Sequence, residues 1–338
     1  MNTRKITVIV SIILFSLASS GCKKNDGDNN RSQTEDKDIS DHRASVESKE
    51  TDPAKDEREE TTVFAARTFQ SDIPFGVFTY KTQQDFFEAD GFMSGIRIGQ
   101  TEPGQVIQIP ECHVWYVTPT EASPDWGKIA AEVAQNNVPG LQVMGINDAS
   151  LSHLASLEHL VYLSIHDGSI TDASLKHIDN LRNLQILVLS NCDNLTDASL
   201  EHVQGLENLQ MLFLNCTNFT GSGLKYVKNL ENLKVLWADY NNTEPSLEYL
   251  KDLEKLQVLI LIEARTTDAG LEYVKTLKNL ERLVLESANI TDVGLKHLEN
   301  LKNLEMLYLD SGGCTDAGLE GLKKALPKCK ILRPSGRS

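Results

Sequence analysis

The chain has 338 residues, of which 40% are apolar and 6% aromatic, and its formal net charge is −15. Length and apolar content together suffice for a hydrophobic core, which excludes a wholly disordered protein. The acidic balance excludes nucleic acid as an expected partner, because phosphate binding needs a basic face.

The first 22 residues predict an export signal. Two cations precede an apolar run from Ile6 to about Ala18, which is too short to span a bilayer. The run ends in "LASSGC", which resembles the bacterial lipoprotein signal, although Ser19 stands where that family usually has Leu. The resemblance implies lipid attachment at Cys22 and a lipid-anchored protein of the bacterial cell envelope. Cleavage by an ordinary signal peptidase is the alternative, and it would give a soluble secreted protein.

Residues 23–60 differ sharply from the rest of the chain. They contain almost no large apolar side chains and are dense in charges of both signs. Such a segment cannot bury enough surface to offset its chain entropy, so we expect a disordered tether. The lipid at Cys22 alone would then attach the protein to the membrane.

A repeat of about 24 residues organises the larger part of the chain. Successive copies such as "LRNLQILVL" and "LKNLERLVL" are separated by steps of 24, 25, 24, 23, 24 and 24 residues. They begin at Leu157, Leu181, Leu206, Leu230, Leu253, Leu277 and Leu301. A weaker copy, "VPGLQVMGI", begins at Val138.

Each copy predicts a short strand followed by a helix. The Leu-x-Leu pair places both leucines on one face of a strand. In "ITDASLKHI", Thr171 is expected to cap the helix and Asp172 to favour its positive end. Ile170 and Leu175 stand at the two positions of a hydrophobic staple. Asn183 falls at a turn, where Asn tolerates unusual backbone angles. One coil leaves its apolar side bare, and stacking buries it.

These copies resemble the leucine-rich repeat family, in its ribonuclease-inhibitor-like and cysteine-containing subtypes with "ITDxGL" helices. The resemblance covers Val138 to Leu332 and implies an α/β solenoid with a parallel sheet on the concave side and helices on the convex side. It also implies a protein-binding surface without naming the ligand. We expect this repeat domain at 138–332 and a polar tail at 333–338.

The outward residues of the strands form the candidate binding face, because the core does not need them. We expect their apolar middle column to be solvent-exposed, with Trp237, Phe213 and Tyr308 as aromatic anchors and an acidic border along one edge. The alternative is that β-branched residues simply fit strands. The predicted contact residues are Tyr162, Val188, Met211, Phe213, Val235, Trp237, Asp239, Ile260, Arg282, Val284, Glu286, Met306, Tyr308 and Asp310.

Asp197, Ser199 and His202 have the side-chain types of a hydrolytic triad, but their columns argue for scaffolding. The histidine column reads His153, His177, His202, Tyr226, Tyr249, Tyr273, His297 and Gly321. The serine column reads Ser150, Ser174, Ser199, Gly223, Ser246, Gly270, Gly294 and Gly318. A stacked row of histidines suits tetrahedral zinc poorly, so we expect no metal, cofactor or catalytic residue in the repeats.

The cysteines leave two pairings open. Cys192 and Cys216 each lie four residues before a helix-start Thr, in neighbouring coils, and we expect buried free thiols there, with a disulfide as the alternative. A bridge between Cys314 and Cys329 is also left open.

Residues 61–137 differ from the repeats. Short runs such as "FGVFTY", "VIQI" and "HVWYV" predict strands, and a helix with Ser123 as its cap follows them. We expect a small β cap on the first coil; the alternative is an enzyme with its active site here and the repeats as a recruiting arm. Its candidate pair, Cys112 and His113, is expected to point to opposite faces of a strand. A third reading, an F-box-like adaptor, lacks F-box helices and contradicts the export signal.

Overall fold

The computed structural model describes residues 64–80, 95–121, 124–216, 218–239 and 246–334. The expected leader with Cys22, the tether at 23–60 and Ser123 lie outside the described residues. Within the described ranges, every helix falls short of the length and apolar content that crossing a bilayer requires.

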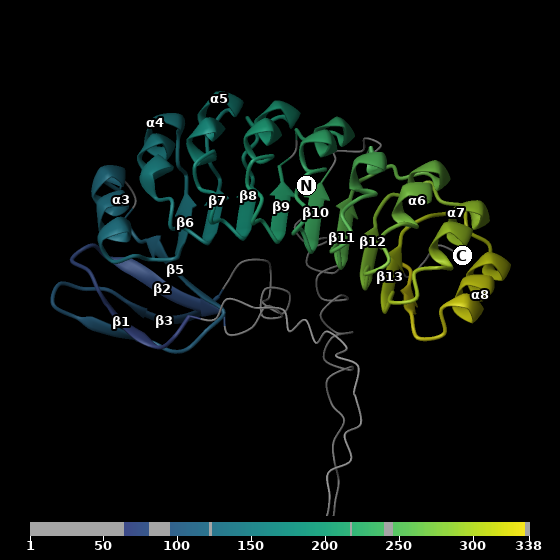
Figure 1. The fold of residues 1–338 in the computed structure, drawn as a ribbon, viewed down its shortest axis with the longest axis horizontal. Coiled ribbons are helices and arrows are strands. Elements are labelled where there is room, and N and C mark those ends of the chain that lie inside the picture. The colour runs from purple at the N-terminus through teal and green to yellow at the C-terminus, as the bar shows by residue number, and fades with distance from the viewer. Residues whose placement is uncertain (1–63, 81–94, 122–123, 217, 240–245, 335–338) are drawn as a thin grey trace, which may run out of the picture.

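The described residues form a curved solenoid built on a 12-stranded sheet (Figure 1). Its strands follow one another in chain order from β6 to β14 and pair in parallel, one per coil. They are β6 (Gly140–Met144), β7 (Tyr162–His166), β8 (Ile186–Ser190), β9 (Met211–Asn215), β10 (Val235–Asp239), β11 (Val258–Ile262), β12 (Arg282–Leu285), β13 (Met306–Leu309) and β14 (Lys330–Leu332).

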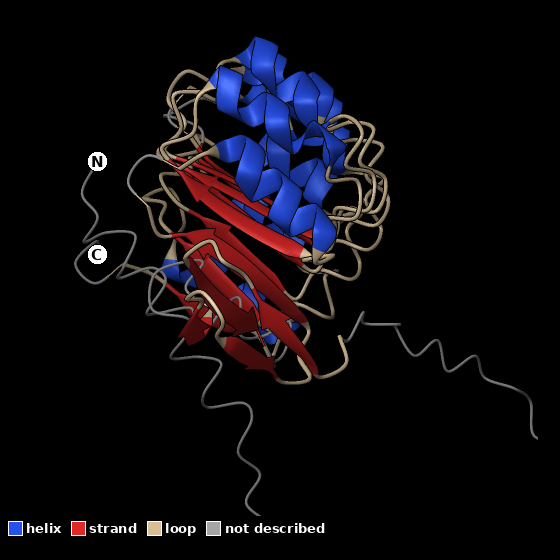
Figure 2. Cartoon of the chain, turned by 90° about the vertical axis from the view of Figure 1, so that its left-hand side faces the viewer, coloured by secondary structure: helices blue, strands red, loops and turns tan. Residues whose placement is uncertain are grey.

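Short helices return the chain along the convex side, and Figure 2 shows them together on one face of the solenoid sheet. Several are 3₁₀ helices, because each coil has only a few residues for this segment. They are α4 (Asp148–Leu151), η1 (Ser152–Ser156), α5 (Asp172–Leu175), η2 (Lys176–Ile178), η3 (Asp197–His202), η4 (Gly221–Tyr226), η5 (Leu247–Leu250), α6 (Asp268–Val274), α7 (Asp292–Leu298) and α8 (Asp316–Ala325).

The main core lies between the sheet and these helices. Inward strand residues such as Leu163 and Ile165 are fully buried there, as are Ile170 and Leu175 at the predicted staple positions. The same apolar cluster runs from the first coil to the last. The predicted leucine-rich repeat solenoid, with its parallel sheet and convex helices, is therefore confirmed.

Neighbouring coils are joined by a hydrogen-bonded Asp–Thr pair. Thr171 occupies the N-cap position of α5, as predicted, but its hydroxyl does not cap its own helix. It donates instead to the Asp148 carboxylate of the preceding coil at 2.8 Å, and the Thr171 backbone N–H donates to the same carboxylate at 2.7 Å. The pair repeats as Asp172–Thr196, Asp197–Thr220, Asp268–Thr291 and Asp292–Thr315.

Asparagines join the coils at the opposite end of the helices. The Asn183 side chain donates to the Glu158 carbonyl of the preceding coil at 2.8 Å. We expected Asn183 to serve through an unusual backbone angle, but the positive φ values of this region fall elsewhere, at Asp167 and Asn191. The role of Asn183 is therefore to form a side-chain hydrogen bond to the preceding coil. Equivalent bonds are made by Asn208, Asn232, Asn279 and Asn303.

The N-terminal region extends the same sheet. Strand β5 (Val114–Pro119) pairs in parallel with β6 at Val117 and Leu141, and β2 (Phe75–Tyr80) and β3 (Ile96–Gln100) follow in antiparallel pairing. Strands β1 (Arg67–Gln70) and β4 (Val106–Ile109) form a separate two-stranded sheet. The predicted strands are present, and their continuity with the repeats supports our proposal that this region caps the first coil.

Gly140 permits the close approach of this region to the solenoid. A Cβ atom at Gly140 would lie 2.6 Å from the Cβ atom of Tyr116 and 2.7 Å from the carbonyl oxygen of Trp115. Helix α3 (Trp126–Gln135) follows the cap strands and is closed by Asp125, whose carboxylate accepts from the Lys128 N–H at 3.1 Å. The prediction of Ser123 as its cap was wrong, because the first helical residue is Trp126 and Asp125 directly precedes it.

Candidate partner-binding face

A second apolar cluster lies on the side of the sheet opposite the main core. We call it the concave cluster. Its buried members are Tyr80, Val114, Tyr116, Tyr162, Ile186, Val188, Met211, Phe213, Val235, Trp237, Val258, Ile260, Ile262, Val284, Met306 and Tyr308. The sheet separates the two clusters, because alternate strand residues point to opposite faces. Most of the predicted contact residues therefore share one surface.

The parallel register places the predicted aromatic anchors side by side. Phe213 on β9 is paired with Trp237 on β10, and Trp237 with Ile260 on β11. Farther along, Val284 on β12 is paired with Tyr308 on β13. The middle column read from the sequence is thus a continuous ladder across the sheet.

The expected exposure of this ladder was wrong. Val188 is 1% exposed, Phe213 3% and Trp237 4%, so the face is closed in the isolated chain. A period-two pattern shows which residues share a face and carries no information about how exposed that face is.

The acidic border also differs from the expectation. Asp239 is 3% exposed and Glu286 8%, whereas Asp310 and Arg282 are half-buried. Burying a carboxylate is costly unless it is paired or hydrogen-bonded. Asp239 and Glu286 are therefore part of the closed face and do not form a solvated rim.

Three tyrosines end the concave cluster at the cap, and the sequence patterns did not connect them. The Tyr116 ring lies 5.5 Å from that of Tyr80 and 4.8 Å from that of Tyr162. The Tyr116 hydroxyl accepts from the Gly95 N–H at 2.9 Å. Burial raises the pKa of all three phenols, so they stay neutral at physiological pH. Only the pairing of β5 with β6 brings the cap residues to this face.

Ser164 and His166 form a polar pair on the same strand, β7, that was also missed. The Ser164 hydroxyl lies 2.7 Å from Nε2 of His166. Burial lowers the pKa of His166 and favours the neutral imidazole. Among the described residues, no carboxylate is hydrogen-bonded to Nδ1 of His166, so the orienting partner of a catalytic triad is missing. We interpret the pair as a polar element of the face.

The triad suggested by the repeat sequence does not assemble. The Asp197 carboxylate binds Thr220, and the Ser199 hydroxyl donates to the Thr196 carbonyl at 2.8 Å. The His202 ring lies 2.9 Å from the Asp179 carboxylate of the preceding coil. All three side chains join coils or close turns.

Ser246 of the serine column directly precedes η5 as its N-cap. It therefore does not occupy the helix position of Ser174 and Ser199, although the alignment had predicted that position for it. In the described part of the chain, no group of three His, Cys, Asp or Glu side chains is arranged to hold a metal.

The five cysteines among the described residues are free and buried. Cys112 belongs to the main core, and burial raises the pKa of its thiol. A thiolate nucleophile is therefore disfavoured at Cys112, which weakens the alternative of an active site in the cap region. The Cys314 thiol donates to the Ile290 carbonyl at 3.4 Å, and burial raises the pKa of both Cys314 and Cys329 to about 11.

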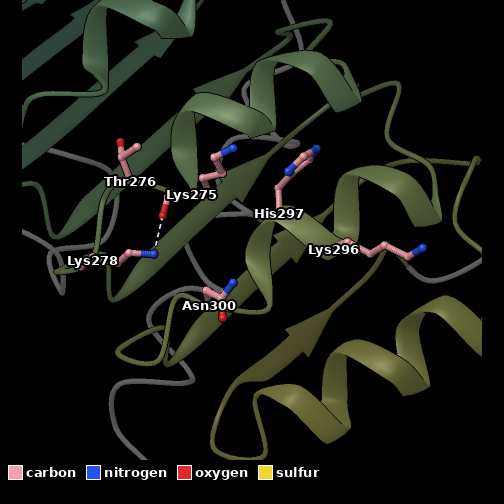
Figure 3. A pocket seen from close by; sticks show the side chains of 6 residues that line it. All are labelled: Lys275, Thr276, Lys278, Lys296, His297 and Asn300. Atoms are coloured by element: carbon pink, nitrogen blue, oxygen red, sulfur yellow. Dashed lines mark hydrogen bonds between the residues drawn. The ribbon is translucent and has the colours of Figure 1, made fainter.

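A basic pocket lies at the C-terminal ends of α6 and α7 (Figure 3). It is lined by Lys275, Thr276, Lys278, Lys296, His297 and Asn300. The Lys278 amine donates to the Lys275 carbonyl at 2.7 Å, and the Lys275 amine pairs with Glu272 at 3.0 Å. Cations are favoured at helix C-termini, so Lys275 and Lys278 stabilise the C-terminal end of α6.

The repeated strand–turn–helix coil, the parallel concave sheet and the convex helices define a leucine-rich repeat solenoid. Comparison with protein-family models and with curated proteins finds no match.

Solved structures that resemble the chain include an internalin, inlF, from Listeria monocytogenes, with 24% identity, a TM-score of 0.47, and coverage of 56% of this chain and 52% of the internalin. The plant peptide hormone receptor RGFR1 in complex with RGF2 is 17% identical, with a TM-score of 0.41 and coverage of 64% and 38%. The Arabidopsis receptor kinase HAESA, in complex with the peptide hormone IDA and the co-receptor SERK1, is 18% identical, with a TM-score of 0.40 and coverage of 53% and 30%. The chain thus matches about half the length of the internalin and less of the receptors.

Proposed function

We propose that the protein is an exported, lipid-anchored, non-catalytic binding module whose concave face holds a protein partner. One observation carries the proposal: a second apolar cluster lies on the face of the sheet that the helices of the described residues leave uncovered (Figure 1). The main core already stabilises the coils from the other face. A solenoid buries its core by stacking coils between the sheet and the helices, so a second apolar cluster on the other face serves another purpose.

The chemistry of the cluster supports a protein partner. Trp237, Phe213 and Tyr308 are large aromatic side chains, the type that is enriched in the energetic centres of protein interfaces.

The burial of the face has a kinetic consequence. Because Trp237 and Phe213 are almost inaccessible in the isolated chain, the face must rearrange before a partner can pack on it. Association that requires a conformational change is slower than about 10⁵ M⁻¹s⁻¹, the low end for preformed interfaces. We expect slow capture and slow release.

A charge at the centre of the face tests the proposal. Trp237→Asp should abolish capture of a discrete partner from detergent extracts of the source cells, since a buried unpaired charge disfavours apolar packing. Trp237→Leu, which keeps an apolar side chain, should fold and bind more weakly. Val293→Asp is the matched control, because Val293 is 60% exposed on α7 and lies on the convex side. Equal capture by the Trp237→Asp and Val293→Asp variants would rule out the concave face.

The expected lipid anchoring at Cys22 has a separate test. Metabolic labelling with a fatty acid should mark the wild-type chain and leave Cys22→Ser unlabelled, and membrane fractionation should move the variant to the soluble fraction. Equal membrane association of both chains would refute lipid anchoring at Cys22.

A further inference from the structure

Two buried thiols lie next to each other in the core, away from the concave face. Cys192 is 0% exposed and Cys216 1%, and both belong to the main core. They follow strands β8 and β9 in neighbouring coils, and each lies four residues before the N-cap threonine of its helix, Thr196 or Thr220. They therefore occupy equivalent places in successive turns of the solenoid.

The backbone geometry at this place suits a bridge between the coils. Strands β8 and β9 are in register up to Ser190 and Asn215. Cys216 directly follows Asn215, whereas one extra residue, Asn191, separates Ser190 from Cys192. Neighbouring parallel strands lie about 4.8 Å apart, within the roughly 4.4–6.8 Å that separates the Cα atoms of disulfide-bonded cysteines. The Cys192 thiol donates to the Ile165 carbonyl at 3.8 Å, and the Cys216 thiol donates to the Leu189 carbonyl at 3.5 Å. Ile165 and Leu189 are paired in β7 and β8, so the two thiols hold equivalent positions in consecutive coils.

Packing alone does not require a thiol here. Ala264 and Ala288 are buried three residues after the last inward leucine of their strands, where Cys192 follows Leu189. Alanine thus fills the corresponding space in later coils. The presence of two thiols in adjacent coils calls for a chemical reason.

We propose that Cys192 and Cys216 are the site of a disulfide that joins two coils and forms when the chain folds in an oxidising environment. The export expected from the leader would supply that environment. The proposal does not depend on the partner-binding function of the concave face.

The reaction is an ordinary thiol–disulfide exchange with a disulfide oxidant such as oxidised glutathione. The Cys192 thiolate attacks one sulfur of the oxidant, whose S–S bond breaks, and the first glutathione leaves and takes up a proton. The Cys216 thiol then loses its proton, and its sulfur attacks the Cys192 sulfur and expels the second glutathione. The two cysteines lose two electrons and two protons in total, and the oxidant becomes two thiols.

Both sulfurs are inaccessible in the folded chain, so exchange has to occur while these coils are open. Oxidation of the folded protein should therefore be much slower than oxidation during refolding.

Peptide mapping tests the bridge directly. The full chain is unfolded and reduced, refolded with a mixture of reduced and oxidised glutathione, and alkylated with iodoacetamide in denaturant. No Lys or Arg lies between Cys192 and Cys216, so trypsin leaves both in one peptide, 183–225. We expect this peptide without alkylation and lighter by two hydrogens than the reduced peptide. Further cleavage after Glu201 should release separate fragments only after reduction.

Two controls make the outcome decisive. Cys112, which lies in the cap, should be alkylated in the same sample and shows that the reagent works. The double variant Cys192→Ala, Cys216→Ala should fold, and dithiothreitol should lower the urea midpoint of the oxidised wild type without changing that of the variant. Alkylation of both Cys192 and Cys216 after oxidative refolding, or an equal effect of dithiothreitol on both chains, would overturn the proposal.

Discussion

Single Asp–Thr pairs hold neighbouring coils in register. The Asp172 carboxylate accepts from the Thr196 N–H at 2.7 Å and from its hydroxyl at 2.6 Å. Asp172→Ala should lower the free energy of unfolding by about 1–2 kcal/mol, because it removes two charge-assisted bonds between coils. Asp316→Ala is the matched control: Asp316 occupies the same helix position in α8, and no later coil in the described chain offers a threonine. Urea unfolding measures both variants, and equal losses would show that only the helix dipole matters.

The same pairs make stability depend on pH. The hydroxyl and N–H of Thr315 lower the pKa of Asp292 below its ordinary value. A carboxylate with a lowered folded-state pKa stabilises the protein above its unfolded pKa of about 4, and this contribution is lost as the pH falls through the folded value. The difference in Tm between the wild type and Asp292→Asn should be largest above about pH 5 and shrink below about pH 4. A difference that stays constant from pH 3 to pH 7 would contradict this account.

The sequence predicts which residues start each helix but does not predict the residues that they bind in the neighbouring coil. The motif around Thr171 and Asp172 predicted a helix start, which is correct. A cap is a local interaction, whereas the observed bonds join residues 23 or 24 positions apart and depend on how the coils stack. The alternation of His and Tyr at the position of His202 in successive repeats argues against a catalytic triad. The ion pair of His202 with Asp179 could not be predicted, because it also depends on how the coils stack.

At the scale of the helical element, glycine permits the close approach of the preceding coil's aspartate at Gly294 and Gly318. A Cβ atom at Gly318 would lie 2.1 Å from Oδ1 of Asp292, whereas one at Gly270 would lie no closer than 3.3 Å to the mobile end of Leu247. The residue aligned with these aspartates in the coil before Gly270 is Glu244, which lies outside the described residues. Among the described residues, a Cβ atom thus meets a carboxylate at Gly318 and only a flexible apolar side chain at Gly270.

Alanine substitutions in α8 and α6 separate this steric effect from helix propensity. Gly318→Ala should cost about 1–3 kcal/mol, because the methyl group displaces Asp292 and breaks its bonds to Thr315. Gly270→Ala should be neutral or stabilising by up to about 1 kcal/mol, since alanine favours helices. Thermal unfolding of both variants measures the difference. Equal changes in the two variants would remove the steric explanation.

At the scale of the whole molecule, two apolar clusters lie on the two faces of one sheet. The repeat period predicted the main core correctly, because stacking of identical coils determines it. The sequence predicted most of the repeat residues that form the concave cluster, but it did not predict that they are buried. The continuation of the cluster into Tyr80 and Tyr116 was missed. The continuation depends on the pairing of β5 with β6, which no repeat pattern encodes.

Site-specific photo-crosslinking in the source cells tests the central proposal, that the concave face holds a protein partner. A photoreactive phenylalanine analogue replaces Trp237 or Tyr308 at the concave face, and Val293 on the convex side serves as the control. We predict that positions 237 and 308 give adducts of one discrete mass above that of the chain, and that position 293 does not. Adducts confined to the same chain at positions 237 and 308, or equal intermolecular adducts at position 293, would contradict the proposal.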